Sequence, residues 1–241
     1  MKNTIKIQNQ NVKMVAHRGL SGLERENTCR AFIAAGNREK YFGIETDVHR
    51  TSDGKYVTIH DGNTGRVSPV NIEIVTSTFE QVRNVLLTDM NGEADRADIR
   101  IPTLEEYISL CKKYGKIAVL ELKVNYEEEQ VEEIIQIIKE MDYLDETVFI
   151  SFYREPLVIV RKLLPKQKIQ YLTDNINEEI INFLKEYNFD IDVAYIAINK
   201  DSIKMLKDAN VEVNVWTVDS ADIAYELIEL GVDYITTNIL E

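Results

Sequence analysis

The sequence predicts an α/β fold, a TIM (β/α)8 barrel with a hairpin and a small insertion after its second strand. Short β-branched runs alternate with amphipathic stretches, and nine such runs follow one another along the chain. One of them follows its predecessor after only seven residues, too few for the crossover of about a dozen that parallel neighbours need. Setting that run aside leaves eight strands in βα order, the number in a TIM barrel. A doubly wound open sheet would show the same alternation and is the alternative architecture.

The strand candidates are residues 14–17, 43–48, 56–60, 117–122, 147–152, 168–172, 193–198, 211–218 and 233–237. Helices are expected in most of the gaps. Residues 103–115 begin with a capping box, Thr103 to Glu106, and stop at a glycine. Residues 127–141 and 220–231 repeat the helical spacing of apolar residues.

The domain organisation is expected to be simple. The composition does not change along the chain, and there are no Pro-rich linkers or low-complexity tracts. Residues 1–241 are therefore interpreted as a single TIM-barrel catalytic domain. The stretch at about residues 61–101 contains one helix candidate, 77–87, and is interpreted as an insertion over the barrel mouth.

The segment GIETDVHRTSDGKYVTIHD, residues 43–61, is predicted to be a β-hairpin that turns at Asp53-Gly54. A two-residue loop would place His60 opposite Asp47, and a four-residue loop would place it opposite Glu45. Either register puts an imidazole beside two carboxylates that point to the same side of their strand. His49, further into the hairpin, is interpreted as structural.

Polar side chains interrupt otherwise apolar strands at or near their carboxyl ends, where TIM barrels build their active sites. They are His17, Arg18, Glu45, Asp47, Glu121, Lys123 and Trp216. Three carboxylates that converge on one mouth need a cation, because unpaired buried charges are costly. Oxygen ligands without a histidine cluster favour a hard ion, which predicts one divalent cation: Mg²⁺, Ca²⁺ or Mn²⁺.

Composition limits the partners. Forty-one acidic residues against 28 basic ones give a net charge of −13, which argues against nucleic acid or an anionic membrane surface. Cys29 and Cys111 lie far apart and form no CxxC pattern, so they are expected to be core thiols. Without a signal peptide or a long apolar run, the expected location is the cytoplasm, with no stable membrane anchor. The oligomeric state is left open.

Seven short motifs together resemble the glycerophosphodiester phosphodiesterase family. They are HRG at 17–19, ENT at 26–28, ETD at 45–47, the Ser-Asp-Gly turn, HD at 60–61, ELK at 121–123 and WTV at 216–218. The resemblance extends from Met14 to about Asn238. The sequence departs from the family pattern at Arg25, where proline is usual, in the segment after Asp61, and at Asn238, where aspartate is usual.

The resemblance implies metal-dependent hydrolysis of glycerophosphodiesters to sn-glycerol 3-phosphate and an alcohol, with a small-molecule phosphodiester as substrate. It assigns Glu45, Asp47 and Glu121 as metal ligands and His17 and His60 as the acid–base pair. Arg18 and Lys123 would hold phosphate oxygens, with Glu26 and Asn27 in support, and Trp216 would form an apolar wall against the glycerol.

Two alternatives from different classes stay open. The first is a related phosphodiesterase acting on lysophospholipids or phospholipid head groups; it would need an apolar groove, whereas residues 61–101 are mostly polar. The second is a non-catalytic barrel that binds a phosphate ester. The presence of both histidines and all three acids argues against it, because a binding protein needs no proton-transfer pair.

Overall fold

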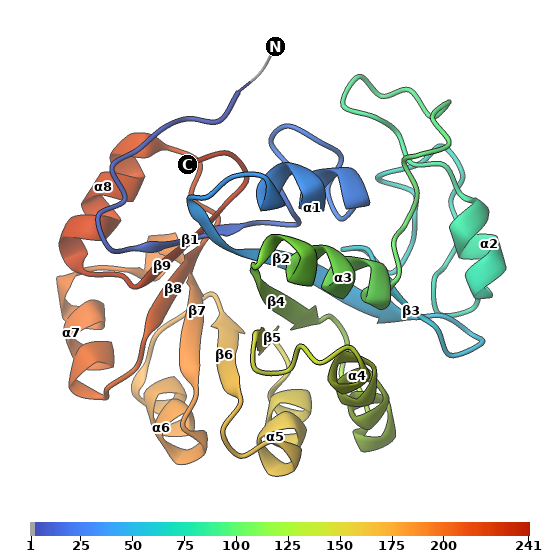
Figure 1. Ribbon diagram of the computed structural model, residues 1–241. Helices are drawn as coiled ribbons and strands as arrows, with labels where there is room; N and C mark the ends of the chain where they lie inside the picture. Colours follow the sequence, from blue (N-terminus) through green and yellow to red (C-terminus); the bar gives the residue numbers. More distant parts are fainter. Residues whose placement is uncertain (1–2) are drawn as a thin grey trace.

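A computed structural model describes residues 3–241 and confirms the barrel (Figure 1). Eight parallel strands follow the order β1-β9-β8-β7-β6-β5-β4-β2, and pairing between β1 and β2 closes the ring. The ring strands are β1 (Lys13–Ala16), β2 (Tyr41–Arg50), β4 (Ile117–Leu122), β5 (Thr147–Ser151), β6 (Lys168–Thr173), β7 (Asp190–Ala194), β8 (Val213–Trp216) and β9 (Tyr234–Thr237).

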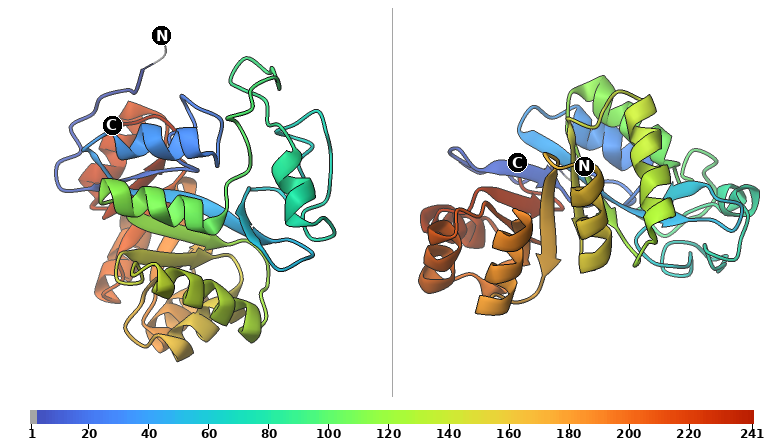
Figure 2. Two further views of the ribbon diagram at one scale, coloured as in Figure 1. Left: turned by 45° about the vertical axis from the view of Figure 1, so that its right-hand side comes forward. Right: turned by 90° about the horizontal axis from the view of Figure 1, so that it is seen from below.

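The helices lie on the outside of the strands (Figures 1 and 2). They are α1 (Cys29–Gly36), α2 (Phe79–Asn84), α3 (Leu104–Tyr114), α4 (Glu128–Glu140), α5 (Arg154–Leu163), α6 (Glu178–Tyr187), α7 (Lys200–Asp208) and α8 (Ala221–Leu230). The capping box predicted for α3 is present, and the helix ends at Gly115 with φ 61°, the left-handed geometry that glycine adopts without strain. Within residues 3–241, no helix has the length and hydrophobicity to cross a bilayer.

Alternation along each strand divides the side chains between two layers. On β4, Ala118, Leu120 and Leu122 belong to the main hydrophobic core between the strands and the helices. Val119 belongs instead to a smaller cluster inside the ring, with side chains such as Val15, Val148, Leu172 and Tyr234. The interior is therefore packed, as in other barrels of this size, and a site can form only at its mouth.

The strand β3 (Tyr56–Thr58) pairs antiparallel with β2 outside the ring, which confirms the predicted hairpin. The insertion that follows packs on it around a hydrophobic cluster of its own, separate from the main core. This cluster consists of Val57, Ile59, Val67, Ile74, Val82, Val85, Leu87, Ile99 and Ile101. Figure 2 shows the insertion standing beside the barrel at the end of the hairpin. We refer to residues 56–101 as the side lobe.

Neither predicted hairpin register is correct. His49 pairs with Val57 and Arg50 with Tyr56, so the connecting loop has five residues, 51–55, and the ladder stops at Thr58. Thr51 closes this longer loop, since its hydroxyl accepts a hydrogen bond from the Lys55 amide and donates to Asp53. His60 therefore lies after the paired part of β3, and its side chain reaches the acids from the segment that follows this strand.

The strand predicted at residues 193–198 is also misplaced. β7 ends at Ala194, and residues Tyr195–Ala197 form a turn of 3-10 helix. Most of the apolar run 193–198, on which the strand prediction is based, lies after the end of β7. The true strand begins in the alternating DIDV sequence, in which Ile191 and Val193 pack in the main core and the aspartates face the other way.

Candidate active site

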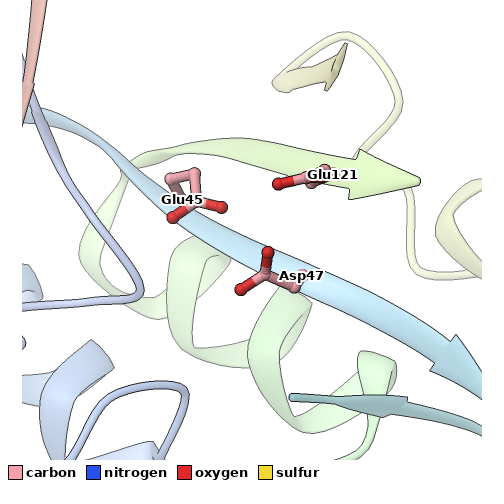
Figure 3. A group of neighbouring side chains, drawn as sticks. All are labelled: Glu45, Asp47 and Glu121. Carbon is pink, nitrogen blue, oxygen red and sulfur yellow. The ribbon is translucent and has the colours of Figure 1, made fainter. Parts of the chain in front are cut away.

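Three carboxylates meet at the mouth of the barrel, as the sequence predicts (Figure 3). Glu45 and Asp47 share one side of β2, and Glu121 of β4 pairs in register with Asp47. Each of the three can place one carboxylate oxygen within 4.8 Å of those of the other two. All three side chains are buried, between 0% and 7% exposed.

Burial and mutual repulsion divide the protons unevenly among these acids. Burial, followed by the charges of Asp47 and Glu121, raises the pKa of Glu45 well above its usual range. Burial and the charge of Asp47 raise the pKa of Glu121 to about 8. Burial would also raise the pKa of Asp47, but the positive charges of Lys123 and Arg18 outweigh it and the net pKa is lowered. The protein thus places three acids beside two cations, and the neutral form is favoured at Glu45 and Glu121 while Asp47 keeps its charge.

The two cations predicted for phosphate binding lie against the acids. The Lys123 ammonium is 3.0 Å from Glu121 and 3.1 Å from Asp47. The Arg18 side chain is 3.0 Å from Glu26 and 3.6 Å from Asp47. The backbone of Arg18 has φ 53°, and its N–H donates to a Glu45 oxygen at 2.7 Å, which fixes the loop after β1 to the cluster.

Asn27 and Glu26 support the site from the same loop. The Asn27 amide donates to Asp47 at 2.7 Å and accepts from Thr46, so it holds the Asp47 carboxylate in one orientation. Glu26 accepts hydrogen bonds from Arg18 and from Arg66 of the side lobe. The supporting role predicted for this pair matches these contacts.

His17 has a defined tautomer. The Asn238 amide donates to Asp219 at 2.6 Å, and its oxygen accepts from the Ser21 hydroxyl. That oxygen lies 2.7 Å from His17 Nδ1, so Nδ1 must be the donor and Nε2 is left with the lone pair. Burial and the positive charge of Arg18 lower the pKa of His17 to about 4. His17 is therefore a neutral imidazole at pH 7.

His60 has different surroundings. Its Nδ1 is 2.6 Å from Asp61, whose other oxygen accepts from Arg66 at 2.6 Å. Burial lowers the pKa of His60, and the charges of Arg18 and Lys123 act in the same direction; the charge of Asp47 and the hydrogen bond to Asp61 oppose this shift without reversing it. Of the two imidazoles, His60 is the one placed between carboxylates.

Arg66 is a site residue that the sequence reasoning missed. Its guanidinium holds Asp61, which orients His60, and Glu26, which orients Arg18. Arg66 lies in a polar stretch where the sequence predicts no strand or helix, so nothing in the sequence indicated that its side chain would face the site. His49 is structural as predicted: it is 7% exposed and its Nε2 lies 3.2 Å from the His60 carbonyl oxygen.

These groups surround a cavity of about 70 Å³, room for a few water molecules or a small polyol. Its charged side consists of His17, Arg18, Glu45, His60, Glu121 and Lys123. Its other side consists of Ile150, Phe152, Leu172, Asp192, Trp216 and Thr236. The Trp216 ring meets Phe152 edge to face at 5.7 Å and donates to the backbone oxygen of Asp192. Asp192 is the second site residue missed from sequence.

The donor set fits a hard divalent cation. All three candidate ligands are carboxylates, they are buried together, and two of them have a raised pKa because of burial and then of the neighbouring carboxylates. A bound cation would favour the charged form of all three.

Comparison with known proteins points to one family. The profile described as "Glycerophosphoryl diester phosphodiesterase family" matches residues 17–241. A glycerophosphodiester phosphodiesterase of Caldanaerobacter subterraneus is 30% identical over 93% of both chains.

Solved structures give the same result. A glycerophosphodiester phosphodiesterase of Parabacteroides distasonis is 30% identical with a TM-score of 0.77, over 95% of this chain and 93% of that one. An Oleispira antarctica phosphodiesterase, solved with the product sn-glycerol-3-phosphate, shares the fold with a TM-score of 0.86 at 24% identity, over 94% and 92% of the two chains.

Proposed function

This chain belongs to the glycerophosphoryl diester phosphodiesterase family, a family of hydrolases, and on that premise we propose that it hydrolyses glycerophosphodiesters to sn-glycerol 3-phosphate and an alcohol. One observation carries the proposal: three buried carboxylates, two imidazoles and two cationic side chains meet at the barrel mouth, and all of them except Asp47 line one cavity. A phosphodiester is a stable anion, and its cleavage needs positive charge near the non-bridging oxygens. It also needs a base that takes a proton from the nucleophile and an acid that gives a proton to the departing alcohol.

The phosphate is proposed to bind on the charged side of the cavity. Glu45, Asp47 and Glu121 would hold one divalent cation, Mg²⁺, Ca²⁺ or Mn²⁺, whose chemistry is to neutralise charge on the non-bridging oxygens. Arg18 and Lys123 supply the remaining positive charge. Their present contacts with the acids, at 3.0–3.6 Å, support this role because they already point into the cluster.

The surroundings of the two histidines favour different tasks. His17 presents an unprotonated Nε2, and its lowered pKa keeps that nitrogen free to accept a proton from the nucleophile, which is either the glycerol 2-hydroxyl or a water molecule. His60, whose Nδ1 is held by the Asp61 carboxylate, is assigned the role of proton donor to the departing alcohol. The two roles require one neutral and one protonated imidazole, and the hydrogen bond to Asp61 limits the lowering of the His60 pKa.

The alternative substrates have less support. The side lobe contains an apolar groove lined in part by Pro69, Val70, Ile72, Val85 and Leu86, a feature that the sequence did not suggest. None of its lining residues lines the catalytic cavity, so a lipid chain bound there has no shown path to the phosphate site. A barrel that only bound a phosphate ester would not need two histidines for proton transfer.

A turnover assay tests the proposal. The purified protein would be incubated with glycerophosphocholine, -ethanolamine, -inositol and -glycerol in the presence of each metal, and sn-glycerol 3-phosphate would be measured. We expect release from at least one substrate and none from a His17→Ala/His60→Ala protein. A lack of product from all four substrates with all three metals would overturn the proposal. Release of choline from lysophosphatidylcholine, tested in parallel, without product from the four glycerophosphodiesters would favour the lipid alternative.

A further inference from the structure

Asp192 is a buried acid that the proposed chemistry does not use. It lies on β7, is 2% exposed, and lines the cavity beside Leu172 and Trp216. Its Oδ1 is completely covered and has no hydrogen-bond partner within residues 3–241. Leaving a buried oxygen unpaired costs free energy, so the missing partner needs an explanation.

Other polar groups inside the barrel have found partners. One layer deeper, Asn214 donates to Gln170 and accepts from Thr236, both at 3.1 Å. Asp190, two residues before Asp192 on the same side of β7, is 2.7 Å from Lys168 and accepts the Glu212 amide at 2.8 Å. On the same side of the cavity, the Trp216 N–H and the Thr236 hydroxyl both have partners, so within residues 3–241 the unpaired polar atom of that side is Asp192 Oδ1. The hydroxyls of Tyr41 and Thr58 are also unpaired, but neither residue lines the cavity.

The surroundings of Asp192 indicate what kind of group would pair with it. Burial, and then the negative charge of Glu121, raise the pKa of Asp192 well above its usual range, which favours the neutral carboxyl. A neutral carboxyl both donates and accepts a hydrogen bond. Its neighbours Leu172 and Ile150 are apolar, and an anion or a cation would lack a counter-charge from either. A hydroxyl group, which also donates and accepts, is the matching partner.

Position in the ring indicates which hydroxyl. In the closed order of eight strands, β7 is four places from β2 in either direction, so Asp192 faces the acid cluster across the mouth. The phosphate is assigned to the β2 side, and the glycerol must extend away from it over Trp216. The hydroxyl farthest from the phosphate then reaches β7.

We propose that the Asp192 carboxyl binds the terminal free hydroxyl of the glycerol unit and so selects glycerol esters over diesters without that group. The inference rests on the proposed function of the site. It makes Asp192 a specificity residue, in contact with a part of the substrate that does not react.

The test compares glycerophosphocholine with its analogue that lacks only the terminal hydroxyl, a propane-1,2-diol phosphodiester. We expect the wild-type protein to prefer the glycerol ester by about 10- to 100-fold in kcat/KM, the range for an unpaired buried group. Asp192→Leu, which has the same branched shape, should lose that preference. Asp192→Asn, which can still donate and accept, should keep most of it, and Asp190→Asn is the matched control that should keep all of it.

Binding and stability separate this inference from the proposed function. Calorimetry with sn-glycerol 3-phosphate and propane-1,2-diol 1-phosphate should show the same preference without turnover, and Asp192→Leu should lose it. Because the leucine removes an unpaired polar group, that variant should melt no lower than wild type. An unchanged preference in Asp192→Leu, or no preference in wild type, overturns the inference even if turnover is normal. A wild type that turns over no diester but still prefers the glycerol phosphate overturns the proposed function alone.

Discussion

The two sides of the barrel mouth differ in how their polar groups are supported. On the β1, β2 and β4 side, every functional group touches another: Lys123 touches two acids, Asn27 holds Asp47, and Asn238 holds His17. On the β5 to β8 side, the cavity is lined by Ile150, Leu172, Trp216 and one acid, Asp192, whose Oδ1 has no partner among residues 3–241. The first side is preorganised for chemistry, and the second is shaped for a ligand. Perturbing each side should therefore change different kinetic constants.

The largest effect is expected from the acid cluster. Glu45→Gln should abolish binding of the divalent cation and reduce kcat by on the order of 10³-fold, because charge neutralisation at phosphorus is lost. The cation-free variant should melt no lower than the cation-free wild type, since the amide replaces a carboxyl whose ionised form is unfavourable in the cluster. Calorimetric titration with Mn²⁺ measures the metal binding, steady-state rates give kcat, and thermal melts with and without metal give the stability. Glu132→Gln, at an exposed position of α4, is the control. Full activity of wild type after exhaustive chelation would contradict the metal assignment.

The histidines come next. His17→Ala and His60→Ala should each lower kcat by ~10²- to 10⁴-fold. Because both act in one proton-transfer sequence, the double variant should lose far less than the product of the single losses. Steady-state rates of all three proteins give the comparison. If either single variant kept near-normal turnover, that histidine would be structural.

A smaller effect is expected at Arg66, which links the side lobe to the charged side. Arg66→Gln removes the contacts that orient Asp61 and Glu26, and we expect a loss of about 10-fold in kcat/KM, as for other groups that orient active-site side chains. Arg96→Gln is the matched control, because Arg96 lies in the same insertion and pairs with Asp98. Equal activity of the two variants would show that the Arg66 contacts are not needed.

The smallest effect concerns pH. Exchanging Asn238 and Asp219 for one another, as Asn238→Asp with Asp219→Asn, keeps the net charge but places the carboxylate on His17. An adjacent negative charge raises the pKa of the imidazole, so His17 becomes protonated at higher pH and the acidic limb of kcat/KM should move up by about one pH unit. The pH profile of the double variant is compared with that of Asp219→Asn. An unmoved limb would mean that His17 is not the base.

The charged side could be predicted from the sequence because its residues break a strand pattern. Glu45, Asp47 and Glu121 interrupt apolar strands at the carboxyl end, which is rare without a reason, and the parallel register then brings them together. His60 was placed near them for the right reason but in the wrong register. The hydrophobic pattern does not distinguish a loop of two, four or five residues when a threonine such as Thr51 can close the longest one.

The other side was harder to predict. Asp190 and Asp192 made the start of β7 look like a loop, because aspartate is depleted in strands. The apolar YIAI sequence that follows favours a strand on composition alone, although Ile196 is 78% exposed in the structure. In a barrel, a strand that faces a polar cavity inverts the usual pattern, with apolar residues against the helices and acids inside. Only three-dimensional neighbours reveal that Asp192 lies opposite the acid cluster.

The separate hydrophobic cluster of the side lobe has a consequence for how the protein loses activity. His60 and Arg66 are carried by chain anchored in that cluster, whereas His17 and the acids are anchored in the barrel. Regions built on separate hydrophobic clusters open with their own opening equilibria. Mild denaturant should therefore speed amide hydrogen exchange in the lobe before it affects the barrel strands. The enzyme would then inactivate while its barrel is still intact, and inactivation would reverse as soon as the lobe closes.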